Sequence, residues 1–192
     1  PVGGMDMIAK GFEEQVGELI TYNAKVTRIH HEGDQVTASW ISADSGSNEQ
    51  TETADYCICT IPFSVLSQID HDFSPRMSKI IDSMPYASAF KAGIEFKRRF
   101  WEEDEHIYGG ISYTNLPITL ISYPPYNMFS DGPGVLLAAY PWGAYAYQFN
   151  ALSPEERIDK VMEYGSQIHP QYYDEFKTGA SVAWHRVPWT LG

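Results

Sequence analysis

The sequence predicts an α+β fold in two parts that join near residue 83. In the first part, apolar residues at helical spacing come first. Two runs in which apolar and polar residues alternate follow, one on each side of a tight turn, which is typical of a helix plus a β-meander. The second part has three strongly apolar runs and one helix with a capping box, which predicts a mixed sheet with a flanking helix. With 192 residues, 43% of them apolar and 14% aromatic, the chain can bury a core. Length alone fits one domain or two small ones.

The first part begins with a helix over residues 5–16 and a short strand over residues 19–22. The helix is predicted because apolar side chains recur at its period, at Met5, Ile8, Phe12 and Val16. Two strands, residues 24–29 and 35–41, are expected to form a hairpin around the turn Glu32-Gly33-Asp34.

A polar turn over residues 42–51 leads into the run 54–61, which is almost continuously apolar and predicts a strand covered on both faces. Cys57 and Cys59 lie one residue apart in this run. That spacing matches neither a C-x-x-C redox site nor a zinc pair, so we expect two buried thiols. Proline after a capping residue, at Ser74-Pro75, predicts a short helix that ends near residue 82.

Three strands are expected in the second part, over about residues 87–97, 118–123 and 134–141. A helix follows from Ser153, because Ser153-Pro154-Glu155-Glu156 combines a capping box with proline in the first turn. A last strand is expected over residues 180–186.

The charge balance excludes some classes of partner. Thirteen Lys and Arg against 25 Asp and Glu give a net charge of -12, which argues against nucleic acid or an anionic membrane surface. The acidic run over residues 102–105 is expected to cap a solvated turn, with a metal site as the weaker alternative. No run reaches the length of a transmembrane helix and no signal peptide is evident. Both ends look cut, as in a proteolytic fragment, a processed subunit or a deliberately expressed domain.

Lys91 is the residue that points most directly to chemistry. Alternate side chains share a face of a strand, so Lys91 lies on the side of Ala89 and Gly93, opposite the apolar side chains of the same run. These small neighbours leave room above the Lys91 ammonium group for a flat molecule. Edge strands also use lysine to block unwanted pairing, and the strand alone favours neither interpretation.

The segment around Lys91 and its flanks resembles the flavin-dependent amine oxidase superfamily and, within it, the L-amino-acid oxidases. The resemblance rests on short motifs in order along essentially the whole chain, of which none is diagnostic alone: Gly3-Gly4-Met5-Asp6, Ala54-Asp55-Tyr56-Cys57-Ile58-Cys59-Thr60-Ile61-Pro62, Phe90-Lys91-Ala92-Gly93-Ile94-Glu95-Phe96, Arg99-Phe100-Trp101-Glu102-Glu103-Asp104, Asn115-Leu116-Pro117, Ser122-Tyr123-Pro124 and Gly134-Val135-Leu136-Leu137-Ala138-Ala139-Tyr140. It implies that residues 1–83 are the middle segment of an FAD-binding domain and residues 84–192 a substrate-binding domain that is truncated at its end. The chain has no G-x-G-x-x-G turn, so it carries at best part of an FAD site.

The resemblance also assigns residues around the cofactor. Val26 matches the position whose backbone groups meet the adenine of FAD, and Lys91 matches the lysine that holds a water against flavin N5. A cation there stabilises the negative charge that develops on the flavin and then on oxygen. Trp184 matches a tryptophan that packs near the flavin ring, with a core tryptophan as the alternative.

Two residues are expected at the substrate. Tyr140 matches the tyrosine that hydrogen-bonds the substrate carboxylate in L-amino-acid oxidases. The arginine that completes this clamp in the family belongs to a part that this chain lacks. Trp142 follows in a segment that departs from the family pattern, and it shares a face with Tyr140, which suggests an aromatic or bulky substrate side chain.

The implied function is that of a fragment of an FAD-dependent L-amino-acid oxidase. Hydride passes from the amino acid Cα to the flavin, and water hydrolyses the resulting imino acid to a 2-oxo acid and ammonia. Oxygen then reoxidises the reduced flavin and is itself reduced to hydrogen peroxide. The implied partners are the remaining segments of the flavoenzyme, the amino acid and oxygen, and a homodimer stays open. Alone, the chain should turn over nothing. An amine or polyamine oxidase and a non-catalytic binding module are the alternatives.

Overall fold

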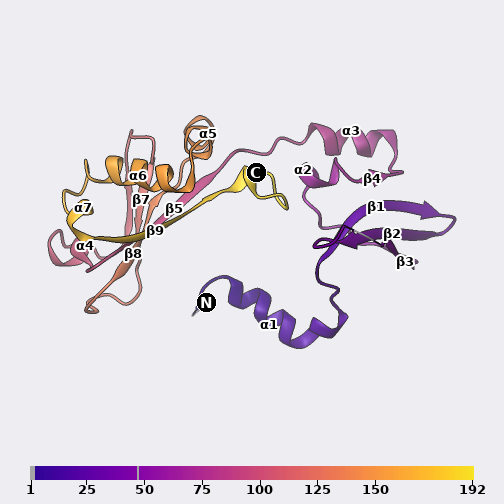
Figure 1. The fold of residues 1–192 in the computed structure, drawn as a ribbon, viewed down its shortest axis with the longest axis horizontal. Coiled ribbons are helices and arrows are strands. Elements are labelled where there is room, and N and C mark those ends of the chain that lie inside the picture. Colours follow the sequence, from indigo (N-terminus) through magenta and orange to yellow (C-terminus); the bar gives the residue numbers. More distant parts are fainter. Residues whose placement is uncertain (1–2, 47) are drawn as a thin grey trace. The chain divides into compact units, whose positions relative to one another are not determined.

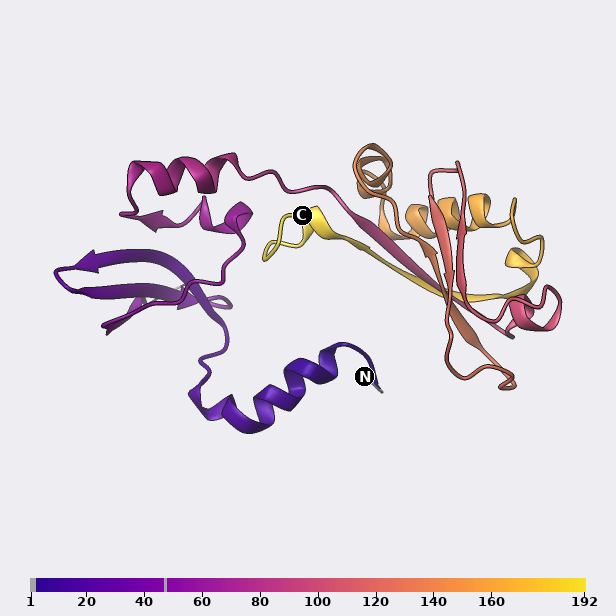
Figure 2. The same ribbon diagram turned by 180° about the vertical axis from the view of Figure 1, so that it is seen from behind.

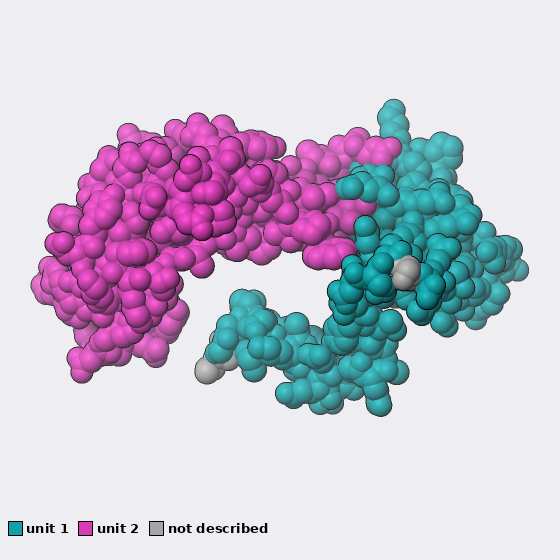
Figure 3. Space-filling model, viewed as in Figure 1, with its two compact units in different colours: residues 1–61, 66–81 teal, residues 62–65, 82–192 magenta. Residues whose placement is uncertain are grey.

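The computed structural model describes residues 3–46 and 48–192, and it divides the chain into two compact units (Figures 1 and 3). Unit 1 runs to Ile61 and includes Leu66–Ile81, whereas unit 2 comprises Pro62–Val65 and Asp82–Gly192. Each unit has its own sheet, so the protein is a mixed α/β structure with two sheets. The assignment of the two parts to FAD-binding and substrate-binding domains stays a prediction.

Unit 1 contains a four-stranded sheet in the order β3-β2-β1-β4. The β1–β2 and β2–β3 pairs are antiparallel, and β4 joins β1 in parallel. The predicted hairpin is confirmed, with Gly33 in its turn at a φ of 68°, a conformation that glycine adopts without strain. The elements up to residue 83, of which α2 lies mostly in unit 2, are α1 (Asp6–Val16), the 3₁₀ turn η1 (Gly17–Leu19), β1 (Ala24–Glu32), β2 (Gln35–Ser42), β3 (Gln50–Ala54), α2 (Phe63–Leu66), β4 (Asp70–His71) and α3 (Pro75–Ser83).

The first helix is confirmed, but the short strand predicted over residues 19–22 is wrong. The chain leaves α1 through η1 and a turn, and Asn23 then takes a positive φ of 57° before β1 begins. The apolar stripe of α1 contacts no core among the described residues, since Met5 is 70% exposed and Phe12 is 67% exposed. Helical periodicity therefore predicted the element but not its burial.

The strand predicted over residues 54–61 is also wrong. β3 ends at Ala54, and the apolar run that follows has no regular structure and lies exposed, with Ile58 at 91%. Cys57 and Cys59 are exposed free thiols rather than buried ones. A strand covered on both faces needs neighbours on each side, and none of the described residues supplies them.

Unit 2 is built on a five-stranded sheet in the order β6-β7-β8-β5-β9. All the recorded pairings in it are antiparallel, so the predicted mixed sheet is wrong. The reason is that β8 and β9, although parallel to each other, lie on opposite sides of β5 and never pair. The elements are β5 (Phe90–Phe96), α4 (Phe100–Glu103), β6 (Gly110–Tyr113), β7 (Leu120–Tyr123), β8 (Gly134–Ala139), α5 (Ala144–Asn150), α6 (Pro154–Gly165), α7 (Tyr172–Glu175), β9 (Phe176–Ala183) and the 3₁₀ turn η2 (Trp184–Arg186).

One face of this sheet carries the core. Along β5 the side chains of Phe90, Ala92, Ile94 and Phe96 are fully buried, whereas the intervening ones are partly exposed. The helices α5 and α6 cover the buried face (Figures 1 and 2), where Phe149 stacks on Phe90 with ring centroids 4.5 Å apart. The alternation puts Lys91 on the opposite face, which we call the open face.

The predicted helix from residue 153 is confirmed as α6, with both hydrogen bonds of the capping box between Ser153 and Glu156. The helix start at Ser74-Pro75 is likewise confirmed. The last strand ends earlier than predicted, because the chain turns into η2 at Trp184. The short elements α4, β6, α5 and α7 were not predicted, since each is too short for a periodic pattern.

The acidic run 102–105 is not a simple solvated cap. Glu102 is buried and pairs with buried Arg99, whose hydrogen bond lowers the pKa of the Glu102 carboxyl. Glu102 also accepts a hydrogen bond from the Phe129 N–H at 2.9 Å, and Arg99 donates to the Tyr126 carbonyl at 3.2 Å. The buried pair thus ties the loop between β7 and β8 to α4.

Two helical glycines, Gly165 in α6 and Gly11 in α1, give a matched test of how tightly each helix is packed. A Cβ at Gly165 would overlap the ring of buried Tyr172, whereas a Cβ at Gly11 in α1 would meet nothing within 4 Å. We expect Gly165→Ala to destabilise unit 2 by about 3 kcal/mol or more. Gly11→Ala should instead favour α1 by about 1 kcal/mol, because alanine is the better helix former. Urea unfolding followed by tryptophan fluorescence, with circular dichroism for helix content, measures both, and equal effects would contradict the packing described for Gly165.

Candidate active site

Lys91 lies on the open face near the start of β5, partly exposed. Its Nζ is 4.3 Å from the centroid of the Tyr140 ring, within the range of a cation–π contact. Within the described part of the chain, no carboxylate forms an ion pair with Lys91. By contrast, Lys177 on the neighbouring strand pairs with Glu95 at 2.9 Å. The ammonium group therefore lies against an aromatic ring, and no carboxylate of the described residues neutralises its charge.

Tyr140 and Trp142 follow β8 and have ring centroids 5.3 Å apart. The backbone of Tyr140 is fixed from both sides, because its N–H donates to the Ile118 carbonyl at 3.2 Å and its carbonyl accepts from the Thr119 hydroxyl at 3.1 Å. Trp142 is bridged to Ala89 just before β5, yet its side chain is 54% exposed. The predicted grouping of these two aromatic residues is present, and it lies beside Lys91.

Trp184 is the first residue of η2 and is partly exposed. Its N–H donates to the Ala89 carbonyl at 3.1 Å, and its carbonyl accepts from the Thr190 hydroxyl at 3.1 Å. Because Lys91 pairs with Val182 in the β5–β9 register, Trp184 belongs to the same end of the sheet as Lys91. The four predicted site residues of unit 2 therefore lie at one end of the sheet, where β5 begins and where β8 and β9 end. Val26 lies in unit 1, on β1 next to a β-bulge, and its role stays a prediction.

A hollow of about 340 Å³ continues the open face beyond Lys91. Gly93 forms part of its floor, and a Cβ added there would come no closer than 3.6 Å to its nearest neighbour, Val135. The other residues that line it come from β7, β8 and the loop between them, among them Ser122, Leu137, Pro124, Pro125 and Tyr126. Sequence reasoning found the small residue beside Lys91 but missed the residues of β7 and β8, because strand order decides which of them meet.

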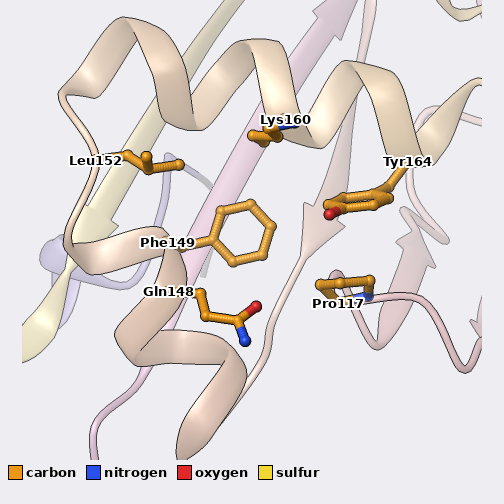
Figure 4. Close-up of a pocket in the computed structure, with 6 residues that line it drawn as sticks. All are labelled: Pro117, Gln148, Phe149, Leu152, Lys160 and Tyr164. Atoms are coloured by element: carbon orange, nitrogen blue, oxygen red, sulfur yellow. The ribbon is translucent and has the colours of Figure 1, made fainter.

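A second, smaller cavity of about 210 Å³ lies on the helix-covered side of the sheet (Figure 4). Figure 4 shows Phe149 and Tyr164 facing it with Pro117, and the remaining lining residues are Gln148, Leu152 and Lys160. The Lys160 ammonium is paired with Glu163 at 2.7 Å. None of the predicted site residues lines either this cavity or the hollow, but the hollow is lined by Gly93, which shares the face of Lys91, whereas this cavity lies among the helices on the other side.

Within residues 3–46 and 48–192, no group of three or more His, Cys, Asp or Glu side chains is arranged to hold a metal ion. No helix in the same residues combines the length and apolar character needed to cross a membrane.

Comparisons with known proteins place these features in a family. The family model described as "Flavin containing amine oxidoreductase" matches residues 1–192. A Bacillus subtilis (strain 168) protein named "Putative L-amino-acid oxidase YobN" is 35% identical over 195 residues, which cover 99% of this chain and 40% of that protein. An L-amino-acid oxidase of Vipera ammodytes ammodytes is 33% identical over 179 residues, which cover 92% of this chain and 36% of the snake protein. The chain thus spans about 40% of the length of such relatives.

Solved structures share the fold. A mutant putrescine oxidase superposes with a TM-score of 0.81 at 19% identity, covering 100% of this chain and 41% of the other. Cyclohexylamine oxidase from Brevibacterium oxydans IH-35A superposes with a TM-score of 0.78 at 15% identity, covering 99% of this chain and 40% of the other. At these identities the likeness concerns the fold alone.

FAD, the cofactor of the family, fits the residues present in part. An unpaired ammonium group beside an uncovered sheet face suits the electron-accepting edge of a flat ring, and Gly93 leaves space next to it. The chain has no Gly-rich dinucleotide turn, so its own residues fit the ring and not the diphosphate. On the match of the family model along the whole chain and the identity to these relatives, the chain belongs to the flavin-containing amine oxidoreductases.

Proposed function

We propose that the chain is the central part of an FAD-dependent L-amino-acid oxidase, which converts an L-amino acid to a 2-oxo acid with release of ammonia and hydrogen peroxide. The observation that carries this proposal is the Lys91 ammonium held 4.3 Å from the Tyr140 ring on the open face. This contact puts a cation for the cofactor and a phenol for the substrate in one place. The identity to L-amino-acid oxidases supports the choice of substrate.

The two groups have different tasks. Lys91 supplies positive charge, and through a bound water a proton donor, where negative charge develops. The Tyr140 hydroxyl has no recorded hydrogen bond to a described residue, so it is available to donate to a substrate carboxylate. Together they orient the amino acid by its carboxylate and leave the Cα to face the cofactor.

FAD would supply the acceptor for the hydride that leaves the Cα. The contribution of this chain is binding, orientation and exclusion of water. Trp142 and Trp184 wall the site on either side of the start of β5, since both are attached through backbone contacts to Ala89. Glu95, the carboxylate nearest to Lys91 in the sequence, is paired with Lys177, and we assign no general base.

The hollow beyond Gly93 has room for the substrate side chain and is largely apolar in its lining. This favours an amino acid with a large apolar or aromatic side chain, and the exposed Trp142 ring agrees with it. The remaining segments of the flavoenzyme, the amino acid and oxygen are the expected partners.

An amine or polyamine oxidase is the second candidate, because the structural matches include a putrescine oxidase and a cyclohexylamine oxidase. Tyr140 separates the two, since an amine has no carboxylate for the phenol to bind. A non-catalytic binding module is the third candidate, and it has no use for an unpaired Lys91.

The test is a substrate survey of the full-length protein loaded with FAD. Peroxide release and ammonia release are measured with the L-amino acids, their D-enantiomers, putrescine and cyclohexylamine. We expect turnover with large apolar L-amino acids and none with the amines. Turnover with the amines alone would replace the proposal by the second candidate, and bound FAD without any turnover would favour the third.

A further inference from the structure

We infer that Ser88, Asn150 and His185 form a hydrogen-bonded clamp that positions Trp184 and the Tyr140–Trp142 segment beside Lys91. The Asn150 amide nitrogen lies 2.9 Å from the Ser88 hydroxyl oxygen and 2.6 Å from His185 Nδ1. The Ser88 hydroxyl oxygen is in turn 3.2 Å from the same imidazole nitrogen. Ser88 is 2% exposed and Asn150 is 1% exposed.

The clamp joins three segments that are far apart in the chain. The pairs in it are separated by 62, 35 and 97 residues, so no local turn or helix brings them together. Ser88 lies just before β5, Asn150 ends α5, and His185 lies in η2. Such a closed set of hydrogen bonds fixes the mutual position of these segments more firmly than apolar contacts do, because its geometry is directional.

Two members of the clamp, Ser88 and His185, are adjacent to residues of the candidate active site. The Ser88 carbonyl accepts a hydrogen bond from the Gly143 N–H at 2.9 Å, directly after Trp142. His185 follows Trp184, whose own N–H is bound to the residue after Ser88. Lys91 lies three residues beyond Ser88 on the strand. A shift of the clamp therefore moves both aromatic walls relative to the ammonium group.

The amide group of Asn150 decides which atoms of the clamp donate and which accept hydrogen bonds. If the Asn150 NH₂ group donates to both partners, His185 Nδ1 must be an acceptor and the imidazole proton sits on Nε2. Asn150 is itself held at the end of α5 by buried Arg157, which donates to the Phe149 carbonyl at 3.1 Å and to the Asn150 carbonyl at 3.4 Å. Asn150 Oδ1 is buried without a partner among the described residues. A buried polar network with one unpaired acceptor stabilises the fold less than an apolar core of the same shape. Such a network is expected where the segments that it holds in position serve the site.

A plain core role is the alternative, and His169 provides the matched control. His169 is buried, whereas His185 is partly exposed. His169 is hydrogen-bonded to the Tyr123 hydroxyl at 2.7 Å and to Glu105 at 2.8 Å, and it packs against Phe100 and Tyr172. It belongs to unit 2 as His185 does, but none of its recorded hydrogen bonds reaches the backbone of Gly143 or Trp184. Because its partner Tyr123 lines the hollow, His169→Phe is a control for the fixing of these segments and not for substrate binding.

Three variants of the full-length protein test the inference. His185→Phe keeps an aromatic ring against Tyr147 but removes the acceptor, whereas His185→Gln keeps an acceptor oxygen for the Asn150 amide. The inference rests on the proposed function for its kinetic readout. We expect His185→Phe to raise KM for the amino acid about tenfold with kcat within about threefold, and His185→Gln to restore most of the loss. His169→Phe should lower the melting temperature without exposing the Gly143 and Trp184 amides.

Amide hydrogen exchange supplies a readout that needs no activity. Protection of the Gly143 and Trp184 amides should fall about tenfold or more in His185→Phe and stay at the wild-type level in His169→Phe. Unchanged protection in His185→Phe overturns the clamp, and so does an equal loss of protection in the His169 variant. If the wild type oxidises no amino acid but protection changes as expected, the proposed function has failed and the clamp has not.

Discussion

Replacing Lys91 with Met in the FAD-loaded full-length protein is expected to slow reoxidation of the reduced cofactor by oxygen about 100-fold or more. Removal of one preorganised charge or donor from a site where charge develops costs on the order of 10²–10³ in rate. The Lys91 ammonium has the position for such a role, since it lies on the uncovered face and is not neutralised by a described carboxylate. Methionine preserves most of the length of the side chain, so the packing against Tyr140 changes little.

The matched control is Lys177→Met, in the same sheet. Lys177 is about half exposed and pairs with Glu95, and exposed ion pairs of this kind contribute little. Stopped-flow absorbance of the flavin during mixing with oxygen measures both variants, and the control should stay within about twofold of the wild type. Equal reoxidation rates for wild type and Lys91→Met would remove the catalytic role and favour a module that only binds.

The local elements with strong periodicity could be predicted from the sequence. The spacing of Met5, Ile8 and Phe12 gave α1, and the alternation around Lys91 gave β5 with its correct buried face. The capping box at Ser153 gave the start of α6 to the residue. These signals are local, because a helix period or a capping box involves residues within a turn or two of each other.

Predictions that depended on neighbours were wrong. The apolar run that contains Ile58 reads as a buried strand, but burial needs partner strands, and the run is exposed. The sheet of unit 2 reads as mixed, but whether β9 pairs with β8 or with β5 is decided by the path through α5, α6 and α7. No pattern in the strands themselves carries that information.

The candidate site likewise has residues that the sequence predicted and residues that it did not. Lys91, Tyr140 and Trp184 were identified from motif resemblance and Trp142 from the face that it shares with Tyr140, and the structure gathers them at one end of the sheet. The clamp was missed, because serine, asparagine and histidine have no significance until they are brought together over distances of up to 97 residues in the chain. The residues of β7 and β8 that line the hollow were missed for the same reason.

Tyr140→Phe tests the substrate class in the most direct way. Phenylalanine keeps the ring against the Lys91 ammonium and against Trp142, so it removes the hydroxyl group and little else. A hydrogen bond to a charged group contributes about 1.5–3 kcal/mol, so kcat/KM for the amino acid should fall about 10- to 100-fold, mainly through KM.

The control for the loss of a tyrosine hydroxyl is Tyr113→Phe, at a 79% exposed residue of β6 in the same unit, and its kinetics should match the wild type. The decisive comparison uses KM for an amino acid and the inhibition constant of the amine that lacks its carboxylate, both measured at saturating oxygen. If Tyr140 binds the carboxylate, the variant loses its preference for the amino acid because only that substrate loses a contact. If both constants are affected equally, the hydroxyl acts on the cofactor or on the position of Lys91, and the assignment of the chain to amino acid oxidation loses its main structural support.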